Sequence, residues 1–225
     1  ERVELTVMLA DEGRCDVREL STYDGWIEER LRASWNGAEE KRFREHMEKY
    51  AKNALGKATL TRAERGEARD LAKPFQLMLE AKGSTFATTG EGSAAVQVSR
   101  GFGLGSLPKT TEKKRRMDLA VTPFTREIVV RVVPPRGFEV VETPPSQEEA
   151  LGPATLAIGS TVDGNGVASM TLRLVLDRNR LTPDEVAELH SAVEKVSEGG
   201  LLSVRLLHAS EVDLAEGRIA EAFEK

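Results

Sequence analysis

The chain has one cysteine, few aromatic residues and no long apolar run. Aromatic side chains make up 5% of its 225 residues, which leaves few platforms for stacking single-stranded nucleic acid. The single cysteine excludes an intrachain disulfide. A formal net charge of −5 argues against a general nucleic-acid binder, which is usually basic. From the charge and the aromatic content we predict no nucleic-acid partner. The longest apolar runs have only the length of a strand, so we also predict no transmembrane segment.

Residue types that bind metals are also sparse. The three histidines, His46, His190 and His208, share no ligand spacing, and no His-x-x-x-His or Cys-x-x-Cys motif occurs. The segment Asp163-Gly-Asn-Gly166 has oxygen ligands but lacks the alternating ligands and the distal glutamate of a calcium loop. Asp and Asn beside Gly are what a tight hairpin turn requires. We therefore predict a turn at 163–166, with no metal and no cofactor site.

Both ends of the chain carry patterns that look incomplete. Residues 1–5 already alternate like a strand, and residues 215–225 stop within a helical pattern. We interpret the sequence as part of a longer protein, so targeting signals could lie outside it.

Apolar periodicity in the first half predicts a hairpin followed by two helices. Apolar residues alternate over 3–9 and again over 14–20, with turn chemistry at 11–13 between them. They then recur at helical spacing in two stretches separated by Asn36-Gly37, and Gly56 is a suitable stop after the second. These helical positions are Ile27, Leu31 and Trp35, then Phe43, Met47, Tyr50 and Ala54. Strands are predicted again between 58 and 98.

A similar order of elements recurs in the second half. Strands are predicted at 128–133 and 138–141, followed by a long hairpin at 155–162 and 167–176. A helix and a last strand at 201–207 come next. Because hairpin, helix and strand then occur twice, an internal repeat is one hypothesis, although the halves share little residue identity.

The helix of the second half is the best specified in the chain. Thr182 is a strong N-cap, Pro183 occupies the first helical position and Glu185 completes a capping box. These roles explain the neighbouring carboxylates of Asp184 and Glu185 without an acid/base function, since negative charge is favourable at a helix N-terminus.

Proline pairs suggest where strands change direction. Pro134-Pro135 and Pro144-Pro145 bracket a short alternating run, and proline ends sheet pairing because it lacks an amide donor.

We predict a β-dominated α+β fold with two antiparallel β-sandwich-like domains, each packing one helical element, at 38–55 and 182–198. The predicted domains are 1–108 and 109–210, followed by a helical tail at 211–225.

A spaced set of strand and turn positions resembles the β-rich domains of unknown function in bacterial transglutaminase-like multidomain proteins, specifically the region after the catalytic core. The resemblance covers roughly residues 1–207. The matching positions are Val-Met-Leu-Ala-Asp-Glu-Gly at 7–13, Gly25, Arg30, Leu-Ala-Lys-Pro-Phe at 71–75, Arg-Arg-Met-Asp-Leu at 115–119, Pro-Pro-Arg-Gly-Phe at 134–138, Pro144-Pro145 and Leu-Thr-Pro-Asp-Glu at 181–185. Residues 208–225 resemble the opening helices of a tetratricopeptide repeat.

The resemblance implies a module beside an enzyme fold, because no segment resembles the transglutaminase-like core. It implies a non-catalytic accessory role, either packing on a neighbouring domain of the same polypeptide or binding a protein partner. An oligomer through residues 211–225 is a further hypothesis. It also implies a bacterial periplasm or cell envelope location, with the cytoplasm left open.

The alternative is a peptide- or small-molecule-processing enzyme with Cys15 as nucleophile, which would need one of the three histidines beside it. Cys15 stands at a strand position where a small core residue is expected, so we interpret it as structural. A glycine-rich segment at 101–105 is interpreted as a loop rather than a phosphate site, since no helix pattern follows it. The basic run at 113–116 is interpreted as a solvated connector. We therefore predict no catalytic residue.

Overall fold

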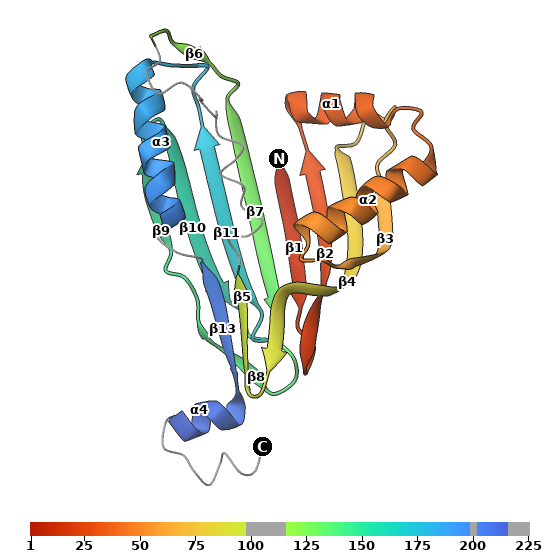
Figure 1. Ribbon diagram of the computed structural model, residues 1–225, viewed down its shortest axis with the longest axis vertical. Helices are drawn as coiled ribbons and strands as arrows, with labels where there is room; N and C mark the ends of the chain where they lie inside the picture. Colours follow the sequence, from red (N-terminus) through yellow and green to blue (C-terminus); the bar gives the residue numbers. More distant parts are fainter. Residues whose placement is uncertain (98–115, 199–201, 216–225) are drawn as a thin grey trace.

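The computed structural model describes residues 1–97, 116–198 and 202–215 (Figure 1). The glycine-rich segment at 101–105 and most of the basic run lie outside this part of the chain, as does most of the predicted domain boundary. The described chain is β-dominated and contains a large curled mixed sheet and four helices, which confirms the predicted β-dominated class.

The first half begins with the predicted hairpin and the two predicted helices. Strands β1 (Arg2–Met8) and β2 (Gly13–Tyr23) pair antiparallel. Helices α1 (Gly25–Trp35) and α2 (Glu40–Ala54) follow, separated at the predicted break. Gly56 comes two residues after α2 with a φ of 64°, a left-handed conformation that glycine adopts without strain.

Most of the remaining elements are strands that complete one long sheet. They are β3 (Thr59–Arg65), β4 (Phe75–Gly90), β5 (Ser93–Gln97), β7 (Phe124–Val133), β8 (Phe138–Glu142), β9 (Gln147–Leu151), β10 (Ala154–Val162), β11 (Ala168–Leu176) and β13 (Ser203–His208), with α3 (Pro183–Glu198), α4 (Ala209–Ala215) and a separate small pair of β6 (Leu119–Ala120) and β12 (Arg180–Leu181). The strand order is β8-β13-β5-β4-β2-β1-β7-β11-β10-β9, with β3 beside β4.

The two halves of the chain meet at two places in this sheet, where β1 pairs with β7 and where β5 pairs with β13. Strand β1 pairs with β7 in parallel, whereas the other strand pairs of the sheet are antiparallel. The sheet is therefore continuous across the predicted boundary, and the arrangement as two sandwich-like domains is not confirmed. The predicted tail begins as α4 at Ala209, and Asp213 within it is buried.

One apolar core follows the period-two pattern of the central strands. Residues at alternate positions of β1, β2, β7 and β11 are buried, since successive strand side chains point to opposite faces. Helix α2 adds three buried residues from one side, Phe43, Met47 and Ala51. Helix α3 lies over β9 and β10 in Figure 1 and buries Val186 and Leu189.

Two predictions of local structure are confirmed at atomic detail. The Thr182 amide donates to Glu185 Oε2 at 2.8 Å, and the Glu185 amide donates to Thr182 Oγ1 at 3.2 Å, which is the predicted capping box. In the 163–166 turn, Asp163 Oδ1 accepts hydrogen bonds from the amides of Asn165 and Val167 at 2.9 and 3.0 Å. The Asp163 side chain thus holds the hairpin turn between β10 and β11.

Candidate functional site

The candidate site is a corner of the molecule formed by α1, the connection 36–39, the end of β3 and the loop 66–74. We call it the α1–β3 corner. Helix α1 lies above the start of β4 in Figure 1, and the loop 66–74 joins β3 to β4 beneath this helix. The corner combines a buried arginine, a projecting leucine and a hollow.

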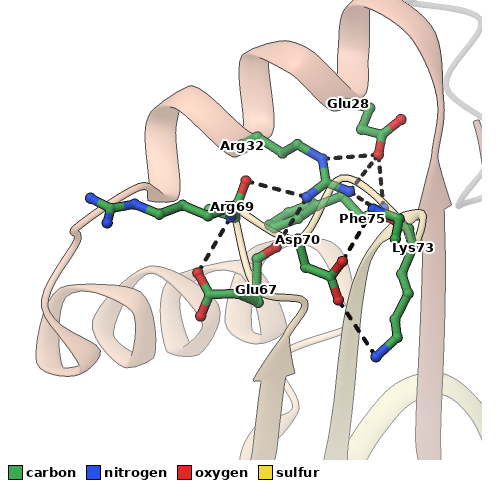
Figure 2. Close-up of polar contacts among 9 residues, drawn as sticks. Glu28, Arg32, Glu67, Arg69, Asp70, Lys73 and Phe75 are labelled. Carbon is green, nitrogen blue, oxygen red and sulfur yellow. Dashed lines mark hydrogen bonds and ion pairs between the residues drawn. The ribbon is translucent and has the colours of Figure 1, made fainter.

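Arg32 on α1 is the buried arginine, with a side chain that is only 9% exposed. Its Nε and Nη2 donate to Glu28 Oε1 at 2.9 and 2.7 Å, one helical turn away. Its Nη1 donates to the main-chain carbonyls of Glu67 and Ala68 at 3.0 and 3.3 Å, and Nη2 also donates to the Lys73 carbonyl. Figure 2 shows the guanidinium at the centre of these contacts.

These bonds explain why a charged side chain can be buried here. A buried cation is stable only when it is paired and its donors are satisfied, and a loop carbonyl away from water needs a donor of its own. Arg32 meets both needs, because Glu28 balances its charge and three loop carbonyls take its remaining donors. The guanidinium carbon also lies 5.4 Å from the centre of the Phe75 ring. The arginine thereby fixes both ends of the loop to α1.

The tip of the loop is ordered by its own short-range contacts (Figure 2). Asp70 Oδ1 accepts the Ala72 amide at 3.1 Å, and Asp70 Oδ2 lies 3.5 Å from Lys73 Nζ. Glu67 Oε1 accepts the Arg69 amide at 3.3 Å. Leu71 stands at this tip and is 80% exposed. An apolar side chain is thus held in solvent on an ordered loop.

A hollow of about 700 Å³ lies beside the loop, between the α1–α2 connection and the end of β3. Small residues at Gly37, Ala38, Ala63, Gly66 and Ala68 form much of its wall. Since these side chains are short, the main chain of β3 and of the connection borders the open space.

Arg65 and Trp35 also line this hollow. The Arg65 guanidinium carbon lies 4.8 Å from the Phe43 ring centre and 5.5 Å from that of Trp35, and the two rings meet edge to face. Arg65 Nη2 donates to the Ala38 carbonyl at 2.7 Å. Trp35 Nε1 and Arg65 Nη1, however, are buried without a hydrogen-bond partner in the described part of the chain. Two donors beside the hollow therefore lack an acceptor.

The thiol considered as a nucleophile lies elsewhere. Cys15 is fully buried on β2 and its Sγ donates to the Ser84 carbonyl at 3.5 Å. Burial raises the pKa of the Cys15 thiol, which disfavours the reactive thiolate. The histidines are on three separate elements: His46 on α2, His190 on α3 and His208 at the end of β13. The structure thus places Cys15 as a core residue.

A second buried polar group was missed by the sequence patterns. Glu19 on β2 is 6% exposed, and its carboxylate accepts hydrogen bonds from Ser21 Oγ at 2.9 Å and from the Tyr50 hydroxyl at 3.0 and 3.1 Å. Burial raises the pKa of the Glu19 carboxyl. The signal was available, because Glu19 occupies an inward position in the alternation that begins with Cys15 and Val17. These contacts join α2 to the sheet.

The residues of the α1–β3 corner were not identified as site residues from the sequence. Trp35 was predicted only as an apolar helix position, whereas Arg32 and Arg65 belong to no motif. Among residues 1–97, 116–198 and 202–215, no group of three or more His, Cys, Asp or Glu side chains is arranged to hold a metal ion. No helix in the same ranges is long and apolar enough to span a membrane. Comparisons with protein families, with curated proteins and with solved structures find no match for this chain.

Proposed function

We propose that this chain is a non-catalytic protein-binding module that docks a partner at the α1–β3 corner. The observation that carries the proposal is the buried Arg32, which holds an ordered loop whose tip exposes Leu71. On the sequence resemblance, the partner would be a neighbouring transglutaminase-like domain of the same polypeptide.

The energetics of association support this role. Ordering a loop on binding costs free energy, and a loop that is already ordered avoids most of that cost. Arg32 supplies the order in advance, because it bonds to carbonyls at both ends of the loop. An isolated exposed leucine is unremarkable by itself, but a rigid one beside a hollow offers a partner both an anchor and a recess.

Cys15 takes no part in this proposal. Its burial and raised thiol pKa are the opposite of what an activated nucleophile requires.

Site-specific photo-cross-linking tests the proposed docking surface. A photoreactive residue replaces Leu71 in the full polypeptide, as expressed in its own cells, and cross-linked peptides are mapped by mass spectrometry. A matched variant carries the same residue at Val162, which is 49% exposed on the β10–β11 hairpin. We expect one discrete cross-linked product from position 71 and none from position 162. Equal products from both positions, or none from position 71, would contradict the proposal.

A further inference from the structure

The free edge of β3 borders the hollow of the α1–β3 corner. Within the described chain β3 pairs only with β4, and Figure 1 shows it at the outer side of the sheet beside α2. A strand edge of this kind presents main-chain donors and acceptors to any chain that reaches it. Only the main-chain groups that do not bond to β4 are open to such a chain.

The register of β3 on β4 decides which main-chain groups of β3 face outward. The Gly66 amide donates to the Gln76 carbonyl at 2.8 Å, which makes these two residues a hydrogen-bonded pair. Hydrogen-bonded and non-hydrogen-bonded pairs alternate in an antiparallel ladder. Arg65 opposite Leu77 and Ala63 opposite Leu79 are therefore non-hydrogen-bonded pairs. The amide and carbonyl groups of Ala63 and Arg65 therefore point away from β4. Both residues also line the hollow.

The two buried donors of the hollow form a second, independent observation. Trp35 is 8% exposed, and its Nε1, like Arg65 Nη1, has no acceptor in the described part of the chain. A buried donor without an acceptor is costly, so such groups are rare in folded proteins and call for a reason. Both residues line the hollow.

We propose that the hollow binds an extended peptide segment, which adds as a strand to the free edge of β3. Main-chain groups of the peptide pair with Ala63 and Arg65, and one peptide carbonyl accepts from Trp35 Nε1 and Arg65 Nη1. The inference rests on the proposed protein-binding function and names the form of the partner: an extended segment recognised mainly through its backbone.

The walls of the hollow fit a peptide backbone. The short side chains of Gly37, Ala38 and Gly66 leave room for a main chain to approach closely. Both unpaired nitrogens are covered by neighbouring atoms, so a small shift of the wall accompanies binding. On the solvent side of β3, Arg62 and Glu64 form an ion pair. Charges on an edge strand discourage indiscriminate pairing with other chains.

The test uses a phage-displayed library of unconstrained dodecapeptides, selected on the folded chain, with dissociation constants measured for the synthetic peptides. Ala63→Pro removes one outward amide without removing a bond to β4, a position at which an edge strand tolerates proline. Ala63→Thr is its matched control, because it keeps that amide. We expect Ala63→Pro to weaken binding at least tenfold and Ala63→Thr to leave it within about twofold.

Trp35→Phe provides a second test, which can still be carried out if Ala63→Pro fails to fold. It removes the unpaired N–H but keeps a ring beside Phe43, so we expect about tenfold weaker peptide binding. Because the smaller ring leaves a cavity in the core, the variant is expected to melt at a lower temperature, so binding is compared where both proteins are fully folded. Bound peptide is also expected to slow hydrogen exchange at the Ala63 and Arg65 amides.

Failure of this inference is separable from failure of the proposed function. Recovery of no binding peptide, or of peptides that bind equally to wild type, Ala63→Pro and Trp35→Phe, overturns strand addition. The cross-linking experiment at Leu71 is independent of these residues, so it would still decide whether the corner docks a protein.

Discussion

Replacing Arg32 with methionine tests how strongly the loop 66–74 depends on one side chain. Removing one member of a buried ion pair typically costs about 3–5 kcal/mol, because the remaining charge stays buried. Here Glu28 is 23% exposed and still accepts the Phe75 amide, so its share of the cost is reduced. The three carbonyls that lose donors can reach water if the loop opens. We therefore expect a loss of about 2–4 kcal/mol in the free energy of unfolding.

Urea unfolding measures this loss of stability. Hydrogen exchange of the amides in the loop 66–74 shows whether the loop itself becomes less stable. Arg32→Lys keeps the charge but cannot match the planar fork, so we expect roughly half the effect. Arg30→Met is the matched control. The Arg30 side chain is exposed on the same helix, with its guanidinium carbon 5.5 Å from the Trp26 ring centre, so a loss below about 1 kcal/mol is expected. A loss below about 1 kcal/mol for Arg32→Met, with unchanged loop exchange, would refute the reasoning.

Three further predictions concern the core. Gly56→Ala is expected to cost at least about 2 kcal/mol in urea unfolding, because a Cβ at this φ of 64° would lie 2.9 Å from the amide nitrogens of Thr85 and Phe86; a neutral effect would contradict this geometry. Since burial raises the pKa of Glu19, the folded state retains a proton that the unfolded state releases, and stability is lost as pH rises from the ordinary glutamate pKa through the raised one. Glu19→Gln is expected to flatten the pH dependence of unfolding in that window, and an unchanged slope would show that another group is responsible. Native Cys15 is expected to react slowly with a thiol reagent at neutral pH and quickly in urea, whereas rapid native labelling would favour the nucleophile alternative.

Local signals predicted local structure well in this chain. The capping box at Thr182 and the turn at Asp163 form because the interacting groups lie within four residues of each other. The hairpin of β1 and β2 was equally visible, since alternation and a turn signal are both short-range patterns.

Features that depend on distant partners were not predictable. The pairing of β1 with β7 joins segments more than 120 residues apart, and the pattern of each strand is compatible with many neighbours. Arg32 is buried because carbonyls 35 to 41 residues later turn toward it, which no helix pattern indicates. The Trp35 position was predicted as apolar, but whether its N–H finds an acceptor is decided by residues far along the chain, such as Arg65, that pack around it.

The central position of β1 also has a consequence for synthesis of the protein. Its partner on one side, β2, follows directly, but its partner on the other side ends at Val133. At typical translation rates of about 5–20 residues per second, roughly 6–25 s separate the synthesis of β1 from that of β7. During that interval one edge of β1 is unpaired in the nascent β1–β2 hairpin, and its apolar side chains are not yet covered. Two nascent chains could then pair with each other through this edge. The same reasoning indicates that residues 1–108 produced alone would keep this edge open and associate through it.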